Sequence, residues 1–254
     1  MWLFLSEKKT VKVGIIGCGA IGTLIAQAIE KKIVKCEELI LYDYIQKKAK
    51  DLKNSIDFPV TIAENLNKML NLKPTIIVEA ASQKAVKDYI KPITSKGIKL
   101  IVMSSGALIG SNYQTERIYV PSGAIGGLDA ISSAALTKIS KVVLTTKKNP
   151  KAFDLNNKLS KIIFEGNAEK AAMQFPRSMN VASTLSFIVK PAKVHVRLIS
   201  DPTIKRNTHE IKVEWQYGEM YFCFSNDPHP ENPKTSALAA WSAIQLLKTL
   251  IKNQ

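Results

Sequence analysis

Three glycines are spaced so that the backbone between them can approach a phosphate group. They follow an apolar run at residues 11–16 and precede a helix-patterned segment at 21–32, giving the order strand, G-x-G-x-x-G, helix. In this arrangement the first glycine makes the turn, the second lets a pyrophosphate approach, and the third lets helix and strand pack closely. The helix N-terminus adds unpaired N–H groups and a partial positive charge. The turn predicts a dinucleotide site, and the residues expected to line it are Gly17, Gly19, Ala20, Ile21 and Gly22.

An acidic residue stands where such a site needs one. Asp43 ends the next apolar run, at residues 39–42, about 20 residues after Gly22, the spacing at which a carboxylate accepts hydrogen bonds from the adenosine ribose. A carboxylate there repels a 2′-phosphate, so NAD is the expected cofactor, while Lys47 and Lys48 in the following helix would also accommodate NADP. Cys18, inside the turn, is interpreted as a small packing residue rather than a nucleophile.

A proton-handling group is expected near the nicotinamide, and histidine is the first candidate. In the predicted strand at 207–216, His209 shares a face with apolar residues and therefore points inward. His195 lies on the polar face of its strand, and His229 lies in a loop between two prolines. A hydrogen-bonded core histidine is the alternative reading of His209.

Small and polar residues follow several of the predicted strands and open two helices. The small residues expected to contact the cofactor are Ala80, Ala81, Ser105, Gly106 and Ala124, with plain tight turns as the alternative. Asn180 would bond the nicotinamide amide, and Arg177 beside it would clamp a carboxylate bidentately. Thr235 and Ser236 open the terminal helix, whose free N–H groups would hold a phosphate or carboxylate, with plain helix capping as the alternative. The spacing of His and Cys fits no metal site.

The first half of the chain alternates strands and helices, which predicts a Rossmann-type doubly wound parallel sheet in an α/β protein. The predicted strands are 11–16, 39–42, 58–62, 75–79, 100–103 and 118–120, and the predicted helices are 21–32, 44–55, 64–70 and 83–95. Ligands bind beyond the carboxyl ends of such strands, which is where the small-residue turns lie.

The second half predicts a smaller α+β domain with a mixed or antiparallel sheet. Its predicted strands are 141–146, 162–165, 193–200, 207–216 and 219–225, and its predicted helices are 127–139, 167–173, 179–189 and 234–251. The last helix carries an apolar stripe and is expected to pack back on the first domain. The expected division is 1–121 plus 233–254 for the dinucleotide domain and 122–232 for the substrate, catalytic and dimerisation domain.

Composition narrows the classes of partner. The 254 residues carry a net charge of +15, but the lysines lie in short pairs along the whole chain without interleaved aromatic residues, so no nucleic-acid partner is expected. No apolar run reaches the roughly 18 residues of a membrane span, and the N-terminal segment lacks a basic region typical of a signal peptide. The three cysteines fit a reducing compartment, and a cytoplasmic location is expected.

Five motifs in the second half of the chain resemble those of the L-aspartate dehydrogenase family and occur in the family's order. The resemblance as a whole covers nearly the whole chain. The motifs are GAIGGLDA at 123–130, EGNA at 165–168, FPRSMNVA at 175–182, NTHEI at 207–211 and NPKTS at 232–236. The resemblance implies oxidative deamination of L-aspartate with NAD or NADP. The product, iminoaspartate, feeds quinolinate and NAD synthesis or hydrolyses to oxaloacetate and ammonia.

The resemblance also implies roles for residues of this chain. Ala124 and Asn180 would contact NAD, and His209 would act as the base, for which an ordinary pKa near 6.5 suits neutral pH. Lys147 joins Arg177, Thr235 and Ser236 as a candidate for the substrate carboxylates, and a homodimer is implied. Two alternatives stay open: a related enzyme resembling dihydrodipicolinate reductase or homoserine dehydrogenase, and a non-catalytic NAD-sensing module.

Overall fold

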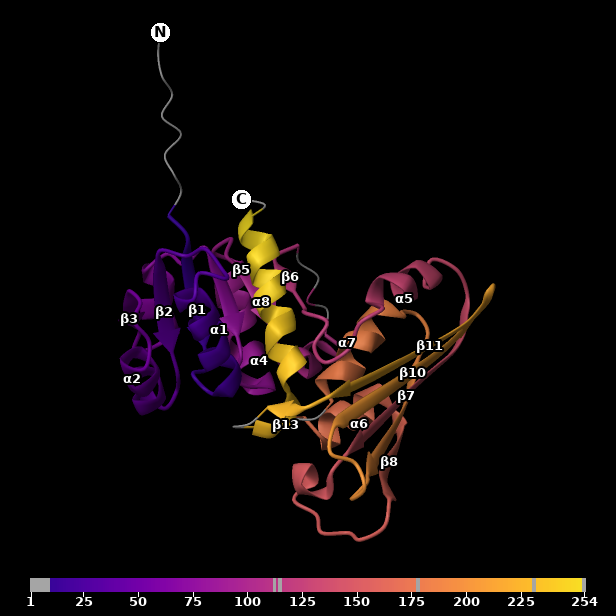
Figure 1. Ribbon diagram of the computed structural model, residues 1–254. Coiled ribbons are helices and arrows are strands. Elements are labelled where there is room, and N and C mark those ends of the chain that lie inside the picture. The colour runs from indigo at the N-terminus through magenta and orange to yellow at the C-terminus, as the bar shows by residue number, and fades with distance from the viewer. Residues whose placement is uncertain (1–9, 112, 114–115, 177–178, 230–231, 253–254) are drawn as a thin grey trace.

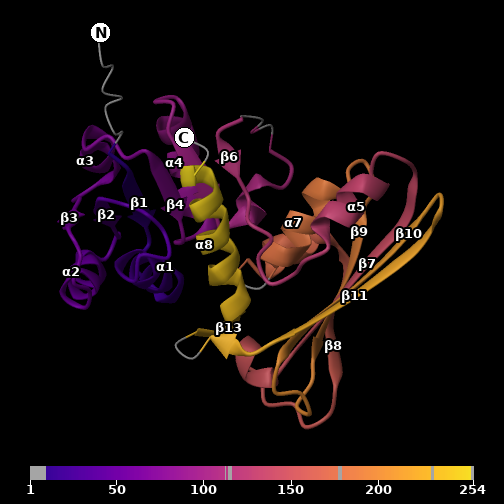
Figure 2. The same cartoon turned by 45° about the horizontal axis from the view of Figure 1, so that its top comes forward.

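The protein is built around two β-sheets that lie side by side, with one long helix beside the first (Figure 1). The computed structural model describes residues 10–111, 113, 116–176, 179–229 and 232–252. Figure 2 shows the same two parts from a second direction, with the C-terminal helix α8 between them.

The first sheet has six strands in the order β3-β2-β1-β4-β5-β6, and all of them run parallel. Its strands are β1 (Lys12–Ile16), β2 (Glu38–Tyr42), β3 (Val60–Ile62), β4 (Ile76–Glu79), β5 (Lys99–Val102) and β6 (Ile118–Tyr119). The central strands are buried along almost their whole length, as expected for a parallel sheet covered on both faces. The strand order reverses at β1, with β2 on one side and β4 on the other, and this switch point is where such sheets bind ligands. The predicted doubly wound sheet is confirmed.

Helices connect these strands on the two faces of the sheet. They are α1 (Ala20–Glu30), α2 (Gln46–Asn54), α3 (Leu66–Asn71), α4 (Gln83–Thr94) and the 3₁₀ turn η1 (Ser105–Leu108). Ser82 caps α4 by accepting a hydrogen bond from the backbone N–H of Ala85, and Asn65 caps α3 in the same way through Lys68. Each cap satisfies an N–H group that the helix cannot pair internally.

The second sheet has five strands in the order β11-β10-β7-β9-β8. Its strands are β7 (Ile139–Lys148), β8 (Lys161–Asn167), β9 (Val194–Ser200), β10 (Asn207–Trp215) and β11 (Gly218–Asn226). Strands β7 and β9 pair in parallel and the other neighbours are antiparallel, so the predicted mixed sheet is also confirmed. Three helices lie along one face of this sheet, α5 (Leu128–Ala134), α6 (Ala168–Gln174) and α7 (Asn180–Ile188), and the turn η2 (Pro150–Phe153) follows β7 (Figure 1).

Two predicted helices differ from the structure. The helix expected over 127–139 ends at Ala134, and residue 139 already belongs to β7. The terminal helix expected from 234 begins at Ala237, because β13 (Asn232–Ser236) pairs with β12 (Pro228–His229) before α8 (Ala237–Lys252) starts. Helix α8 packs against α1, and its Ala243, Ile244 and Leu247 belong to the core of the first sheet.

Candidate active site

The glycine turn has the geometry that its sequence predicts. Gly17 has φ of +97°, and a Cβ there would lie 2.7 Å from the carbonyl oxygen of Ala80. A Cβ on Gly22 would collide with the carbonyl oxygen of Gly17, so this position also requires glycine. Gly19 differs, because a Cβ on it would meet no described atom within 4 Å. The first and third glycines serve close packing, and the second faces open space in which a ligand can approach the backbone.

Asp43 fastens the glycine turn to the end of β2. Its carboxylate accepts hydrogen bonds from the backbone N–H groups of Cys18 and Ile45, each at 2.8 Å. Burial, with a smaller contribution from the charge of Asp43, raises the pKa of Cys18 to about 12. A thiol with so high a pKa stays protonated at neutral pH, so the structure favours the interpretation of Cys18 as a packing residue.

A cavity of about 630 Å³ opens beside this turn. Its lining includes Gly17, Gly19, Ala20, Ile21, Asp43, Lys48, Ala80, Ala81 and Asn180. The structure thus brings together eight of the residues expected at the cofactor, including Asn180 from the second half of the chain, and Lys48 lies with them. Gly106 does not line this cavity, and a Cβ on it would collide with the side chain of Gln83.

A buried carboxylate in the strand-end segment 79–82, to which no role of its own was assigned from the sequence, organises the loops at the edge of this cavity. Glu79, at the end of β4, is 1% exposed and accepts hydrogen bonds from the backbone N–H groups of Ala81, Ser82 and Ser104 and from the hydroxyl of Ser104. Burial raises the pKa of Glu79, although these four hydrogen bonds act in the opposite direction. Glu79 therefore ties the loop after β4 to the loop after β5. An acidic residue ending an otherwise apolar strand was the signal available in the sequence.

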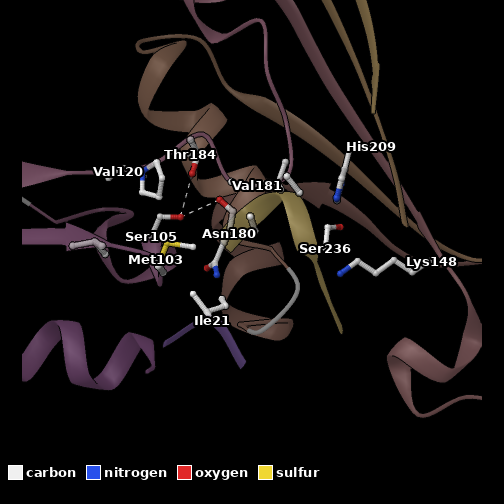
Figure 3. A pocket seen from close by; sticks show the side chains of 15 residues that line it. Ile21, Met103, Ser105, Val120, Lys148, Asn180, Val181, Thr184, His209 and Ser236 are labelled. Atoms are coloured by element: carbon white, nitrogen blue, oxygen red, sulfur yellow. Dashed lines mark hydrogen bonds between the residues drawn. The ribbon is translucent and has the colours of Figure 1, made fainter. Parts of the chain in front are cut away.

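A smaller cavity of about 80 Å³ lies next to the first, and Ile21, Met103 and Asn180 line both. Its lining also includes Ser105, Val120, Ala124, Lys148, Val181, Thr184, His209 and Ser236 (Figure 3). The Ser105 hydroxyl donates to the carbonyl oxygen of Asn180 at 3.0 Å and contacts the Thr184 hydroxyl at 3.3 Å, joining η1 to α7. The carbonyl oxygen of Ala124 accepts a hydrogen bond from Asn226 at 3.1 Å. Two sheets thus meet at this cavity.

The side chain of Asn180 carries a buried hydrogen-bond acceptor that a ligand could use. Its Oδ1 is buried and has no hydrogen-bond partner among the described residues. A buried acceptor without a donor costs free energy, so a ligand that donates an N–H group would be favoured there. The carboxamide of a nicotinamide ring carries such a donor, and Asn180 borders both cavities. The residues present therefore fit a nicotinamide dinucleotide.

His209 points into the smaller cavity from β10, as strand alternation predicts (Figure 3). The side chain is 2% exposed, and its Nδ1 lies 3.0 Å from the Thr146 hydroxyl on the neighbouring strand β7. Burial, aided by the charge of Lys148, lowers its pKa from 6.5 to about 3. The expectation of an ordinary pKa is therefore wrong, and the imidazole is neutral at every pH near 7. Because Nδ1 is paired with Thr146, Nε2 is left for a ligand.

The two lysines at the end of β7 lie on opposite faces of the sheet. Lys147 pairs with Glu210 at 2.8 Å and does not line either cavity, so the structure does not bring it to the site. Lys148 is 3% exposed, and its side chain extends to the smaller cavity near His209 and Ser236 (Figure 3). Burial lowers the pKa of Lys148 to about 8. Sequence reasoning missed Lys148 because it ended the strand at Thr146, although continued alternation places Lys148 on the inward face with Thr146.

The structure places the remaining residues that were predicted to bind the substrate in different positions. Ser236 is 4% exposed and lines the smaller cavity, but Ser236 and Thr235 belong to β13 rather than to the start of a helix. Because α8 begins at Ala237, Ser236 directly precedes the helix, and an anion site at this helix N-terminus stays a prediction. Arg177 lies outside the described residues. His195 lies on the open face of the second sheet and bonds to Glu165 at 3.0 Å, as its polar strand face predicts.

Within the described part of the chain, no group of three or more His, Cys, Asp or Glu side chains is arranged to hold a metal ion. Among the same residues, no helix is both long and apolar enough to cross a membrane.

A doubly wound sheet with a dinucleotide turn, joined to a second sheet that supplies a buried histidine and an unsatisfied asparagine, defines a nicotinamide-dependent dehydrogenase. Comparison with known proteins supports this class. Residues 17–121 match the family "Homoserine dehydrogenase, NAD binding domain", and residues 129–250 match the family "Aspartate dehydrogenase, C-terminal".

Curated relatives match the chain over nearly its whole length. The chain is 39% identical to an L-aspartate dehydrogenase of Archaeoglobus fulgidus, covering 94% of this chain and 97% of the relative, and 36% identical to one of Methanosarcina barkeri, covering 95% and 97%. The crystal structure of an aspartate dehydrogenase from Thermotoga maritima matches with a TM-score of 0.75 at 30% identity, covering 95% of this chain and 97% of that one. The chain belongs to the aspartate dehydrogenase family, and its cofactor is NAD or NADP.

Proposed function

We propose that this protein oxidises L-aspartate to iminoaspartate with NAD as the preferred cofactor. The observation that carries the proposal is the position of His209 in a small cavity that shares Asn180 with the dinucleotide cavity, in a chain of the aspartate dehydrogenase family. Iminoaspartate would then hydrolyse to oxaloacetate and ammonia or supply quinolinate and NAD synthesis.

The residues that would hold the cofactor come from three loops. The N–H groups at the start of α1 would face the pyrophosphate, Asp43 the adenosine ribose, and Asn180 Oδ1 the nicotinamide carboxamide. When bound, the cofactor would supply a hydride acceptor for the substrate carbon that carries the amine. Ala80 and Ala81 leave room for the cofactor between these loops, and Ser105 fixes the backbone of Asn180.

His209 would remove a proton, either from the substrate ammonium or from the water that attacks the imine. A neutral imidazole with Nδ1 paired to Thr146 presents Nε2 as the acceptor when Nδ1 carries the hydrogen. A pKa of about 3 makes His209 a weak base in the ligand-free protein. A substrate with two carboxylates brings negative charge into the cavity and raises this pKa, so His209 becomes a stronger base when substrate is bound.

We also propose a cytoplasmic homodimer with the domain division expected from the sequence. The described cysteines are unpaired, which suits a reducing compartment. Ile162 and Tyr221 are 45% and 64% exposed on strands of the second sheet, and this open face is suited to a second copy of the chain. Sedimentation of the purified protein, with Tyr221→Glu as the comparison, tests the dimer.

The experiment that tests the activity is a panel of amino acids with NAD and with NADP, followed by the absorbance of the reduced cofactor. L-Aspartate is expected to be the preferred substrate. His209→Ala is expected to lower turnover by roughly 10²–10⁴-fold while NAD binding, measured by calorimetry, is kept. Preference for another amino acid, or near-normal turnover in His209→Ala, would refute the proposal.

A further inference from the structure

The hydroxyl of Thr146 is the hydrogen-bond partner that the structure gives to the imidazole of His209. The two residues stand opposite each other in the antiparallel pair of β7 and β10, and Thr146 Oγ1 lies 3.0 Å from Nδ1 of the ring. Both side chains are almost completely buried. Because a buried polar group that loses its partner is costly, this contact holds the ring in one orientation, with Nε2 toward the smaller cavity (Figure 3).

Thr146 can orient another side chain because its own position is fixed. It lies on β7, which pairs with β10 on one side and with β9 on the other, where Leu198 is its partner in register. A β-branched side chain also has few allowed values of χ1. The hydroxyl therefore has little freedom to move away from Nδ1, and a site built on strands is more precise than one built on loops.

Thr146 itself does not line either cavity, whereas His209 lines the smaller one. An effect of this hydroxyl on the reaction must therefore pass through the imidazole. A hydroxyl can accept a hydrogen bond from Nδ1–H, or it can donate one to an Nδ1 without a proton. Only the first arrangement leaves a lone pair on Nε2, which a base needs in order to take a proton from the substrate or from water.

We propose that Thr146 is a positioning residue that accepts a hydrogen bond from Nδ1–H of His209 and so keeps the lone pair of Nε2 directed into the cavity. This inference rests on the proposed function and adds the residue that sets the tautomer of its base. When Nε2 gains a proton, Nδ1 keeps its own, so the bond to Thr146 persists and the ring need not move. A neutral hydroxyl adds no negative charge that would retain the proton on the imidazolium, as a carboxylate at the same place would.

The kinetic test replaces Thr146 by valine, which has nearly the same shape but no hydroxyl. Thr146→Val is expected to lower kcat for L-aspartate by roughly 10–100-fold, the range found when groups that orient metal-binding histidines are removed, with little change in KM. Thr146→Ser restores the hydroxyl and should recover most of the turnover. Thr145→Val, the same change on the opposite face of β7, is the matched control and should keep the wild-type kcat.

A double variant shows whether Thr146 acts through the imidazole. Thr146→Val in the His209→Ala background should cause no further loss of kcat, because the group that Thr146 orients is already absent. Nitrogen-15 spectra of the histidine-labelled protein with NAD bound give a readout that does not depend on turnover. Nδ1 of His209 is expected to carry the proton in the wild type and in Thr146→Ser, whereas Thr146→Val should show both tautomers.

Four results would overturn the inference. They are near-normal kcat in Thr146→Val, failure of Thr146→Ser to recover turnover, a further loss of kcat in the double variant, and a wild-type spectrum with the proton on Nε2. Near-normal turnover in His209→Ala, or a wild-type protein that does not oxidise L-aspartate, would instead refute the proposed function. The two failures are therefore distinguished by different variants.

Discussion

His209 should make the stability of this protein unusually sensitive to acid. The imidazole is buried, and its pKa is lowered from 6.5 to about 3, so the unfolded chain binds this proton at a much higher pH than the folded protein does. Between these two values the free energy of unfolding therefore falls as the pH falls. At about 1.4 kcal/mol per pKa unit, the full effect is roughly 5 kcal/mol, of which roughly 3 kcal/mol is lost between pH 7 and pH 4.

The perturbation that isolates this effect is His209→Asn, whose amide can still bond the Thr146 hydroxyl but cannot take up a proton in this range. Denaturant unfolding of both proteins at a series of pH values gives the two stability curves. The wild type is expected to lose roughly 3 kcal/mol more than His209→Asn between pH 7 and pH 4. His195→Asn, on the exposed face of the second sheet, controls for the loss of an imidazole as such. Parallel curves for wild type and His209→Asn would refute the conclusion that the imidazole is held neutral.

Two further predictions concern the dinucleotide turn. Gly17→Ala should destabilise the fold by roughly 2 kcal/mol or more, because φ is +97° and the new Cβ would meet Ala80. Gly19→Ala should unfold at the wild-type temperature but bind NAD more weakly. Thermal melts with and without NAD distinguish the two variants, and identical melts for both would contradict the geometry. Asp43→Ser should reduce the preference for NAD over NADP by roughly 10-fold or more, because the repulsion between its carboxylate and the 2′-phosphate of NADP is removed. The ratio of kcat/KM for the two cofactors measures this preference. An unchanged ratio would show that Asp43 does not face the ribose.

Regular patterns made most of the fold predictable from the sequence. The buried strands of the first sheet are continuous apolar runs, and the glycine turn follows one of them, so both the parallel sheet and the dinucleotide cavity could be placed. Alternation in β10 is sufficient to turn His209 inward, because a strand has only two faces.

Other features depend on contacts between distant segments, and local patterns do not reveal them. Ser236 was expected at the opening of a helix over 234–251, but pairing with β12 holds residues 232–236 in a strand, and the helix begins one residue later. The pKa of His209 depends on how completely two sheets and α8 enclose it, which a single strand cannot show. Strand β7 continues to Lys148, two residues beyond its predicted end at Thr146, and successive side chains alternate, so Lys148 rather than Lys147 lies on the inward face of the sheet.

The position of α8 also bears on how the protein folds. This helix lies downstream of every other described element, yet its Ala243, Ile244 and Leu247 complete a core whose other members lie between residues 13 and 103. Until it docks, α1 and its neighbours expose an apolar groove, and Ser236 and Ala239 are absent from the cavity around His209. Contacts at such sequence separation form slowly, since a long loop must close first. During synthesis, part of the core of the first sheet is therefore exposed to other chains until α8, which also lines the cavity around His209, has docked.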